Sequence, residues 1–330
     1  NMKRIGLMFP GQGSQHIGMG HELYKRYPMA RDVFDQVDSI LQCHLSQLIF
    51  HGDENELRKT SNAQPAILAH SLATLAVLQS ESNVFHEPSI VMGHSLGEFT
   101  AACAAGYLEL DEAVQMVRAR GKAMEAAAAQ AGETSMVAML PLSYEKSMAL
   151  CEEIQAVQPN HVCQVANWNA TNQVVLSGHK AAVEQAIQLG KEKFKVRRAI
   201  PLDVSAPFHC SLLQSVEQEV EHLLQASTGS KRRKSNATTK EEKKNAPSTT
   251  HMITNINGTL QHDWTSICSD LSKQTCETVK WVRCMDTAIE GTDVETWYEV
   301  GPGVALSNLM KRHTPKHYHC SNAIELIQAL

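Results

Sequence analysis

A single serine stands between two glycines where the chain is expected to turn from a strand into a helix. The run is GHSLG at residues 93–97, which follows the apolar segment 88–93 and precedes an alanine-rich, helix-forming segment. A strand that turns this sharply into a helix strains the backbone of the central residue and lifts its side chain clear of the sheet. Glycines are needed there because a Cβ would collide with the neighbouring strand or helix. This context favours a nucleophilic Ser95 over a purely structural turn.

Strand and helix signals alternate through the N-terminal half. Residues 4–9 and 88–93 are apolar runs typical of buried strands, and helical patterns cover 17–41 and 63–81. Strands that alternate with helices indicate an α/β fold with a parallel sheet covered on both faces. Later strands are expected at 252–256 and 296–300.

The pattern changes between residues 134 and 202. This segment reads as strand, helix, two strands joined by a short turn, helix and strand. A β-α-β-β-α-β order is that of a ferredoxin-like unit. We therefore expect a small ferredoxin-like domain (134–202) inserted into a large catalytic α/β domain made of 1–133 and 203–330.

A strongly basic segment interrupts the second part of the large domain. Residues 227–250 carry seven Lys or Arg and two Glu, whereas the whole chain has a net charge of -5. The segment has no large apolar side chain to bury, so it is expected to be a disordered surface loop. A nuclear-localisation or nucleic-acid role for its KRRK run is the less favoured interpretation, and no nucleic-acid partner is expected.

The composition is that of an ordinary globular protein. No window approaches the ~18 consecutive apolar residues of a transmembrane helix, so no membrane span is expected. The nine cysteines lack a CxxC pair and the sixteen histidines are dispersed, which argues against a disulfide framework and against a metal site. We expect reduced thiols and an intracellular location, in the cytoplasm or in an organelle (mitochondrion or plastid) after removal of a targeting peptide.

A nucleophilic serine needs a base, and histidine is the usual base near neutral pH. His94 precedes Ser95 directly, and on a tight turn its side chain should point away. His209, in PLDVSAPFHCSLL, follows a strand and precedes a helix. Because catalytic groups gather in loops at strand ends of α/β sheets, His209 is the predicted base.

Backbone N–H groups near Ser95 are candidates for stabilising an oxyanion. The N–H of Leu96, directly after the nucleophile, is the first. The glycine-rich loop 10–13 (PGQG) lets a second stretch of main chain approach closely. A nucleotide-phosphate role for this loop is less favoured, since it lacks both G-x-G-x-x-G and the Walker lysine.

Six ordered motifs together resemble the malonyl-CoA:acyl carrier protein transacylases, part of the acyltransferase group of fatty-acid and polyketide synthases. They are MFPGQGSQ (8–15), GHSLGE (93–98), VRARGKAM (117–124), DVSAPFHC (203–210), VKWVRCM (279–285) and YEVGPG (298–303). The resemblance runs from about residue 3 to the C-terminus. It implies an α/β-hydrolase-like domain with an inserted ferredoxin-like domain.

The resemblance also implies a role for individual residues. Ser95 matches the acylated nucleophile and His209 its base, while Gln12 and Leu96 match the positions whose backbone amides form the oxyanion hole. Three further matches are Arg120, which binds the free carboxylate of malonate, Gln274, whose main-chain carbonyl orients the histidine, and Phe208, the bulky residue that favours malonyl over methylmalonyl. A guanidinium suits such a carboxylate because it can grip it with two parallel hydrogen bonds.

The reaction implied is two acyl transfers through Ser95, from malonyl-CoA and then to the phosphopantetheine thiol of an acyl carrier protein, with no cofactor. Carrier proteins of the family are acidic, so a basic docking patch is expected. The candidates are Lys191, Lys193, Lys195, Arg197 and Arg198, which are equally well explained as a solvated helix end. A monomer is the expected state.

Two other classes of function remain open from the residues. A serine hydrolase or thioesterase would use the same turn with water as acceptor; its acidic partner for the histidine would be Asp203, which lies too near His209 to be convincing. A non-enzymatic scaffold with an eroded site is disfavoured because Ser95, His209 and Arg120 are all present.

Overall fold

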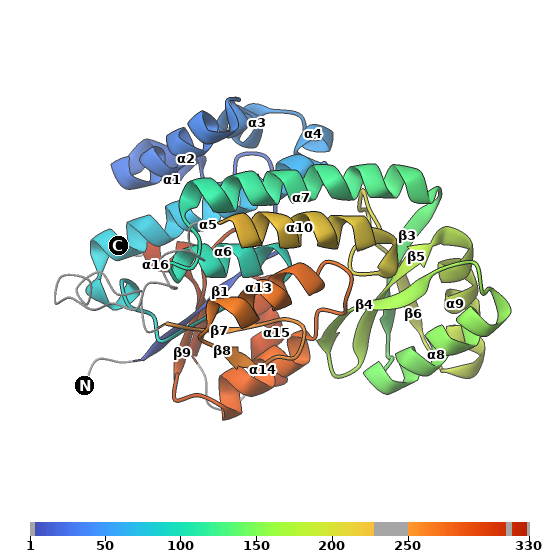
Figure 1. Cartoon of the computed structure of the whole chain (residues 1–330). Coiled ribbons are helices and arrows are strands. Elements are labelled where there is room, and N and C mark those ends of the chain that lie inside the picture. The colour runs from blue at the N-terminus through green and yellow to red at the C-terminus, as the bar shows by residue number, and fades with distance from the viewer. Residues whose placement is uncertain (1–3, 228–249, 315–318, 329–330) are drawn as a thin grey trace.

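The computed structural model describes residues 4–227, 250–314 and 319–328 (Figure 1). The basic segment predicted to be a loop, 227–250, lies outside the described residues except for its two end positions. None of the described helices is long and apolar enough to cross a membrane.

A mostly parallel sheet forms the centre of the larger part of the molecule. Its strand order is β10-β9-β1-β2-β7-β8, and only β8 runs antiparallel to its neighbour. The strands are β1 (Ile5–Phe9), β2 (Ile90–Gly93), β7 (His251–Ile253), β8 (Leu260–Gln261), β9 (Thr296–Glu299) and β10 (His319–Asn322). Each residue of β1 and of β2 is buried, as expected for strands covered on both faces.

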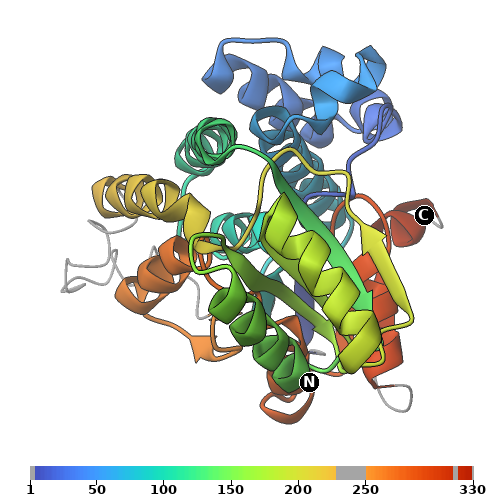
Figure 2. The same cartoon turned by 90° about the vertical axis from the view of Figure 1, so that its right-hand side faces the viewer.

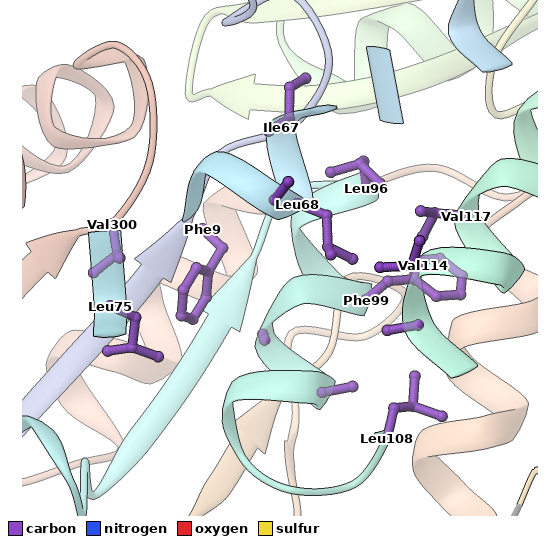
Figure 3. Close-up of a cluster of buried hydrophobic side chains, with 14 of the residues drawn as sticks. Phe9, Ile67, Leu68, Leu75, Leu96, Phe99, Leu108, Val114, Val117 and Val300 are labelled. Carbon is purple, nitrogen blue, oxygen red and sulfur yellow. The ribbon is translucent and has the colours of Figure 1, made fainter. Parts of the chain in front are cut away.

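Helices cover both faces of this sheet (Figure 1). On one face α5 and α6 pack on the strands; Figure 3 shows Phe9 of β1 with Leu68 and Leu75 of α5, and Phe99 of α6 with Val114 of α7. The other face is covered mainly by α14 and α15 around two buried tryptophans, Trp281 and Trp297.

The helices that belong with this sheet have the following bounds: α1 (His21–Arg26), α2 (Pro28–Leu41), α3 (Leu45–His51), α4 (Glu54–Arg58), α5 (Thr60–Glu81), α6 (Leu96–Ala104), α7 (Leu110–Ala131), α10 (Gln214–Ala226), α13 (Trp264–Lys273), α14 (Trp281–Glu290), α15 (Ala305–His313) and α16 (Ala323–Gln328). Two 3-10 turns accompany them, η1 (Asn83–Phe85) and η2 (Ser211–Leu213).

The helical pattern at 17–41 is interrupted, contrary to the sequence-based expectation of one stretch. It forms α1 and α2, which meet at Tyr27 and Pro28. Tyr27 is extended, with φ -121° and ψ 115°, because the ring of a following proline disfavours the helical conformation. Pro28 then occupies the first position of α2, where its missing N–H has no helical partner to lose.

A second, antiparallel sheet has the strand order β4-β5-β3-β6. Its elements are β3 (Thr134–Leu140), α8 (Tyr144–Val157), β4 (Cys163–Ala170), β5 (Gln173–His179), α9 (Lys180–Lys193) and β6 (Arg198–Pro201). Figure 2 shows α8 and α9 covering one face of this sheet. On the other face Met136, Ala138, Ala166 and Val175 pack with Val204 and Phe208. The second sheet therefore turns its free apolar face toward the loop that carries His209.

The segment after Cys276 fastens the second sheet to the rest of the molecule. Val279 forms a parallel bridge with Asn167 of β4; its N–H donates to the Ala166 carbonyl and its carbonyl accepts from the Trp168 N–H, both at 2.9 Å. The Thr278 hydroxyl donates to the Val165 carbonyl at 2.7 Å. These bonds hold β4 beside the loops that build the site.

Candidate active site

The turn that carries Ser95 has the strained geometry expected from GHSLG. Ser95 lies between β2 and α6 with φ 53° and ψ -108°, a backbone conformation that residues other than glycine rarely adopt. A Cβ on Gly93 would lie 2.0 Å from the carbonyl of Gly97, and a Cβ on Gly97 would lie 2.0 Å from the Phe9 carbonyl oxygen. Both positions therefore require glycine, and α6 can pack directly against β1 and β2.

Ser95 and His209 meet across 114 positions of the chain. The Ser95 hydroxyl lies 2.8 Å from Nε2 of His209, and Nδ1 of His209 lies 2.5 Å from the main-chain carbonyl oxygen of Gln274. Because a carbonyl can only accept, Nδ1 carries the proton and Nε2 presents its lone pair to the hydroxyl. The imidazole is thus oriented as an acceptor for the serine proton.

Within the described residues, no carboxylate forms a hydrogen bond with this histidine. Asp203, the acidic residue closest in sequence, forms an exposed ion pair with Arg58. The side chain of His94 is engaged elsewhere, since its Nε2 donates to Asn169 Oδ1 at 2.8 Å and its ring packs against Trp281. The partner of His209 is therefore the Gln274 carbonyl.

Burial lowers the pKa of His209 to about 3, with the nearby Arg120 charge as the second cause. A depressed pKa keeps the imidazole neutral, and so able to accept a proton, at every pH above that value. We therefore expect kcat/KM for acyl-CoA to stay level as the pH falls from about 8 to about 5, without the inflexion near 6.5 of an ordinary histidine. A pH–rate profile with buffer-matched stability controls measures this, and an inflexion near 6.5 would contradict it.

Arg120 is buried on α7, and the acidic group that acts on it is the buried Glu98 carboxyl, whose charge raises the pKa of Arg120 against the effect of burial. Its Nη1 donates to Gln64 Oε1 at 2.8 Å and its Nη2 to Gln274 Oε1 at 3.1 Å, while Nε is buried with no hydrogen-bond partner. Burial lowers its pKa only to about 10, so the guanidinium stays charged at neutral pH. A buried cation with an unused donor is costly unless an anion joins it, and a substrate carboxylate would supply that anion.

Two backbone N–H groups near Ser95 have no acceptor within the described parts of the chain, those of Leu96 and Gln12. The Ser95 N–H, in contrast, donates to Asn255 Oδ1 at 2.8 Å. The Gln12 side chain accepts from the Thr60 hydroxyl at 2.6 Å, and Thr60 in turn accepts from Gln64. Hydrogen bonds through Thr60 thereby connect the loop at 10–13 to Gln64, which also accepts a hydrogen bond from Arg120.

Comparison with known proteins identifies the family to which a chain with this serine, histidine and buried arginine belongs. An acyl transferase domain model matches residues 7–266. The malonyl CoA-acyl carrier protein transacylase of Bacillus subtilis is 38% identical over 312 residues, which cover 94% of this chain and 90% of that protein. The chain belongs to the acyl transferase family, among the malonyl-CoA:acyl carrier protein transacylases.

Solved structures of transacylases share the whole fold. An acyl-carrier-protein S-malonyltransferase from Bartonella henselae has a TM-score of 0.86 and 36% identity, covering 99% of this chain and 98% of that one. A malonyl-transacylase solved in complex with its type II polyketide synthase acyl-carrier protein has a TM-score of 0.84 and 29% identity, covering 99% of each chain.

His209 of this transacylase chain also borders a cavity of about 370 Å³ on the side of the second sheet. The cavity is lined further by residues of α8 and β4 and by Cys276, Glu277, Thr278 and Lys280, whereas Ser95 and Arg120 do not line it. Phe208 is partly buried and packs against the apolar face of the second sheet. Among the described residues no group of His, Cys, Asp or Glu is suited to hold a metal ion.

The five basic residues considered for docking lie at one exposed end of the second sheet and its helices. Lys191 and Lys193 are in the last turn of α9, Lys195 and Arg197 follow it, and Arg198 begins β6. Lys193 pairs with Glu153 at 2.6 Å. None of the five lines the cavity beside His209.

Sequence reasoning missed several polar residues that hold the site together. Asn255 bridges the turn, since its Nδ2 donates to the Gly93 carbonyl at 2.7 Å while its Oδ1 accepts from Ser95. Glu98 is fully buried and accepts from the Asn255 N–H at 3.0 Å; burial raises its pKa to about 8. Glu98 was visible in the motif GHSLGE, but Asn255 and Gln64 carry no local signal, since each acts on a distant segment.

Proposed function

We propose that this protein transfers malonyl groups from malonyl-CoA to the phosphopantetheine thiol of an acyl carrier protein through a malonyl ester on Ser95. The observation that carries the proposal is the Ser95–His209 pair set beside a buried Arg120 with an unused donor. The names of the similar proteins, including one solved with a carrier protein, support the same donor and acceptor.

In the first half-reaction the Ser95 hydroxyl attacks the thioester carbonyl while Nε2 of His209 takes its proton. The oxyanion that forms would be held by the Leu96 and Gln12 N–H groups, preorganised donors of the kind that stabilise tetrahedral intermediates. When the intermediate collapses, the C–S bond breaks and the coenzyme A thiolate takes the proton from His209.

The second half-reaction reverses these steps with another thiol. The phosphopantetheine thiol gives its proton to His209 and attacks the ester carbonyl, and the returning proton restores the Ser95 hydroxyl. Atoms and protons balance with the two thiols alone, so the proposal invokes no cofactor. Such a ping-pong scheme predicts a stable malonyl-Ser95 adduct when carrier protein is withheld.

Acyl selectivity is assigned to Arg120 for the carboxylate and to Phe208 for the size of the pocket. A methyl group is worth only ~1–3 kcal/mol in such discrimination, so malonyl should be preferred to methylmalonyl by a limited factor. The experiment that tests the function incubates wild-type protein with malonyl-CoA or methylmalonyl-CoA and purified carrier protein. Intact mass spectrometry should then show malonylated carrier protein, and equal use of both acyl groups would remove Phe208 from this role.

Hydrolysis of the acyl ester is the competing function. The His209–Gln274 carbonyl contact supports a transferase, because Nδ1 of His209 is occupied by a main-chain carbonyl and not by an Asp or Glu of the described chain, the partner that many serine hydrolases use. The same experiment separates the two, since a hydrolase would release free malonate faster than it loads the carrier thiol.

The finer assignments of architecture and setting are also proposals. We assign 134–202 as a ferredoxin-like domain, supported by its strand order β4-β5-β3-β6, inserted into an α/β-hydrolase-like domain of 1–133 and 203–330. The protein is proposed to act as a monomer, in the cytoplasm or in an organelle.

Carrier-protein docking is assigned to the basic residues around the end of α9. Because charged residues at the rim of an interface set the encounter with an oppositely charged partner, reversing Lys195, Arg197 and Arg198 to Glu should raise the apparent KM for carrier protein roughly tenfold. Hydrolysis of malonyl-CoA without carrier protein should not change. Lys311→Glu on α15 is the matched control, and an unchanged KM in the triple variant would place docking elsewhere.

A further inference from the structure

The side chain of Gln274 joins Arg120 to the turn that carries the nucleophile. Gln274 caps the end of α13 and is fully buried. Its Oε1 accepts from Arg120 Nη2 at 3.1 Å, and its Nε2 donates to the Ser95 carbonyl at 2.9 Å. Arginine can only donate and a main-chain carbonyl can only accept, so these two partners leave one orientation for the amide.

This contact fixes the peptide that contains an oxyanion donor. The Ser95 carbonyl and the Leu96 N–H belong to one planar peptide group and point in opposite directions. The Ser95 carbonyl accepts from the Glu98 N–H of α6 at 3.0 Å as well as from Gln274, and together these bonds aim the Leu96 N–H to the other side. On the preceding peptide, Asn255 holds the Ser95 N–H at 2.8 Å, so both peptide groups of the strained residue are fixed by side chains from distant segments.

The three groups form a chain of hydrogen bonds that starts at a charge. The Arg120 guanidinium polarises the Gln274 amide, which polarises the Ser95–Leu96 peptide and strengthens its N–H as a donor. In a buried network each bond strengthens the next by about 10–30%. Arg120 thereby acts on the oxyanion position whether or not the acyl group carries a carboxylate.

We propose that the Gln274 side chain is a positioning residue that couples Arg120 to the Leu96 oxyanion donor, so that even acetyl transfer depends on Arg120. The proposal rests on the proposed function, because it presumes acylation of Ser95. It assigns Gln274 a side-chain role in addition to the orientation of His209 by its carbonyl, and every substitution at this position leaves that carbonyl in place.

A double-mutant cycle with acetyl-CoA tests the coupling, because acetyl places no carboxylate on Arg120. The variants are Gln274→Met, Arg120→Met and the double substitution, with Lys273→Met as an exposed neighbouring control. The acylation rate constant of Ser95 is measured in a single turnover by quenching and intact mass. Gln274→Met should lower it about ten- to a hundredfold, less than the 10²–10³-fold cost of deleting an oxyanion donor, with the half-saturating acetyl-CoA concentration unchanged.

The decisive result concerns Arg120. Arg120→Met should lower acetyl acylation roughly fivefold in the wild-type background and not at all when Gln274 is already methionine. Equal effects in both backgrounds, or wild-type acylation by Gln274→Met, would overturn the proposal. Gln274→Glu, which keeps an acceptor for Arg120 but has no donor for Ser95, should match Gln274→Met and replaces it if that variant does not fold. A wild-type protein that never acylates Ser95 would instead refute the proposed function.

Discussion

Replacing Ser95 with alanine is expected to lower the rate of malonyl transfer by about 10⁴- to 10⁶-fold, the size of loss seen when a catalytic serine is removed. The Ser95 hydroxyl lies 2.8 Å from Nε2 of the base His209, and without it no acyl ester can form at this position. The backbone contacts of the residue with Asn255 and Gln274 do not involve the side chain and should persist. Intact mass should show no malonyl adduct on this variant.

The stability of the variant separates chemistry from folding. Only the hydrogen bond to His209 is lost, so the free energy of unfolding should fall by no more than about 1 kcal/mol. Ser80→Ala, which removes an exposed hydroxyl from α5, is the matched control and should keep full activity. A malonyl adduct on the Ser95→Ala protein, or transfer at a measurable fraction of the wild-type rate, would disprove the serine-ester scheme.

Replacing Arg120 with alanine or methionine is expected to cost malonyl transfer ~2–4 kcal/mol of transition-state binding, which is about 30- to 1,000-fold in kcat/KM. The reason is that the malonyl carboxylate would then be buried without its cation. Acetyl transfer should fall by much less, since acetyl has no carboxylate to bind. Comparing kcat/KM for malonyl-CoA and acetyl-CoA measures the difference directly.

The methionine variant also has an expected effect on stability. Removing the buried guanidinium lifts its desolvation cost, but it leaves the buried Oε1 atoms of Gln64 and Gln274 without their donor. The two effects oppose each other, so the free energy of unfolding should fall by no more than about 1–3 kcal/mol. Lys122→Met, on the exposed side of α7, is the control. Equal losses for malonyl and acetyl would place Arg120 outside the acyl pocket.

Much of the framework was predictable because it depends on local sequence. The GHSLG run specifies a turn that only two glycines allow, and the structure shows both would-be Cβ atoms in collision. The periodic segments at 134–202 produced the elements in the expected order. The break within 17–41, where one helical stretch is expected, also has a local cause, since Pro28 keeps Tyr27 out of the helical conformation.

The contacts that turn these elements into a site were not predictable in the same way. Gln64 reaches Arg120 across 56 positions, and Asn255 reaches Ser95 across 160. In the sequence both are ordinary amides, which are found far more often on the surface than in a core. Nothing in their neighbourhoods distinguishes them.

The sequence by itself determined the α/β alternation, the strand-to-helix turn at Ser95 and the resemblance that selected His209, Arg120 and the Gln274 carbonyl. Only the tertiary structure decided which side-chain amides hold this turn, and that the buried guanidinium has a donor to spare. The physical reason is that turns and periodicity depend on the dihedral preferences of adjacent residues. A buried hydrogen bond instead depends on which distant segments pack together, and that packing is decided by the whole chain.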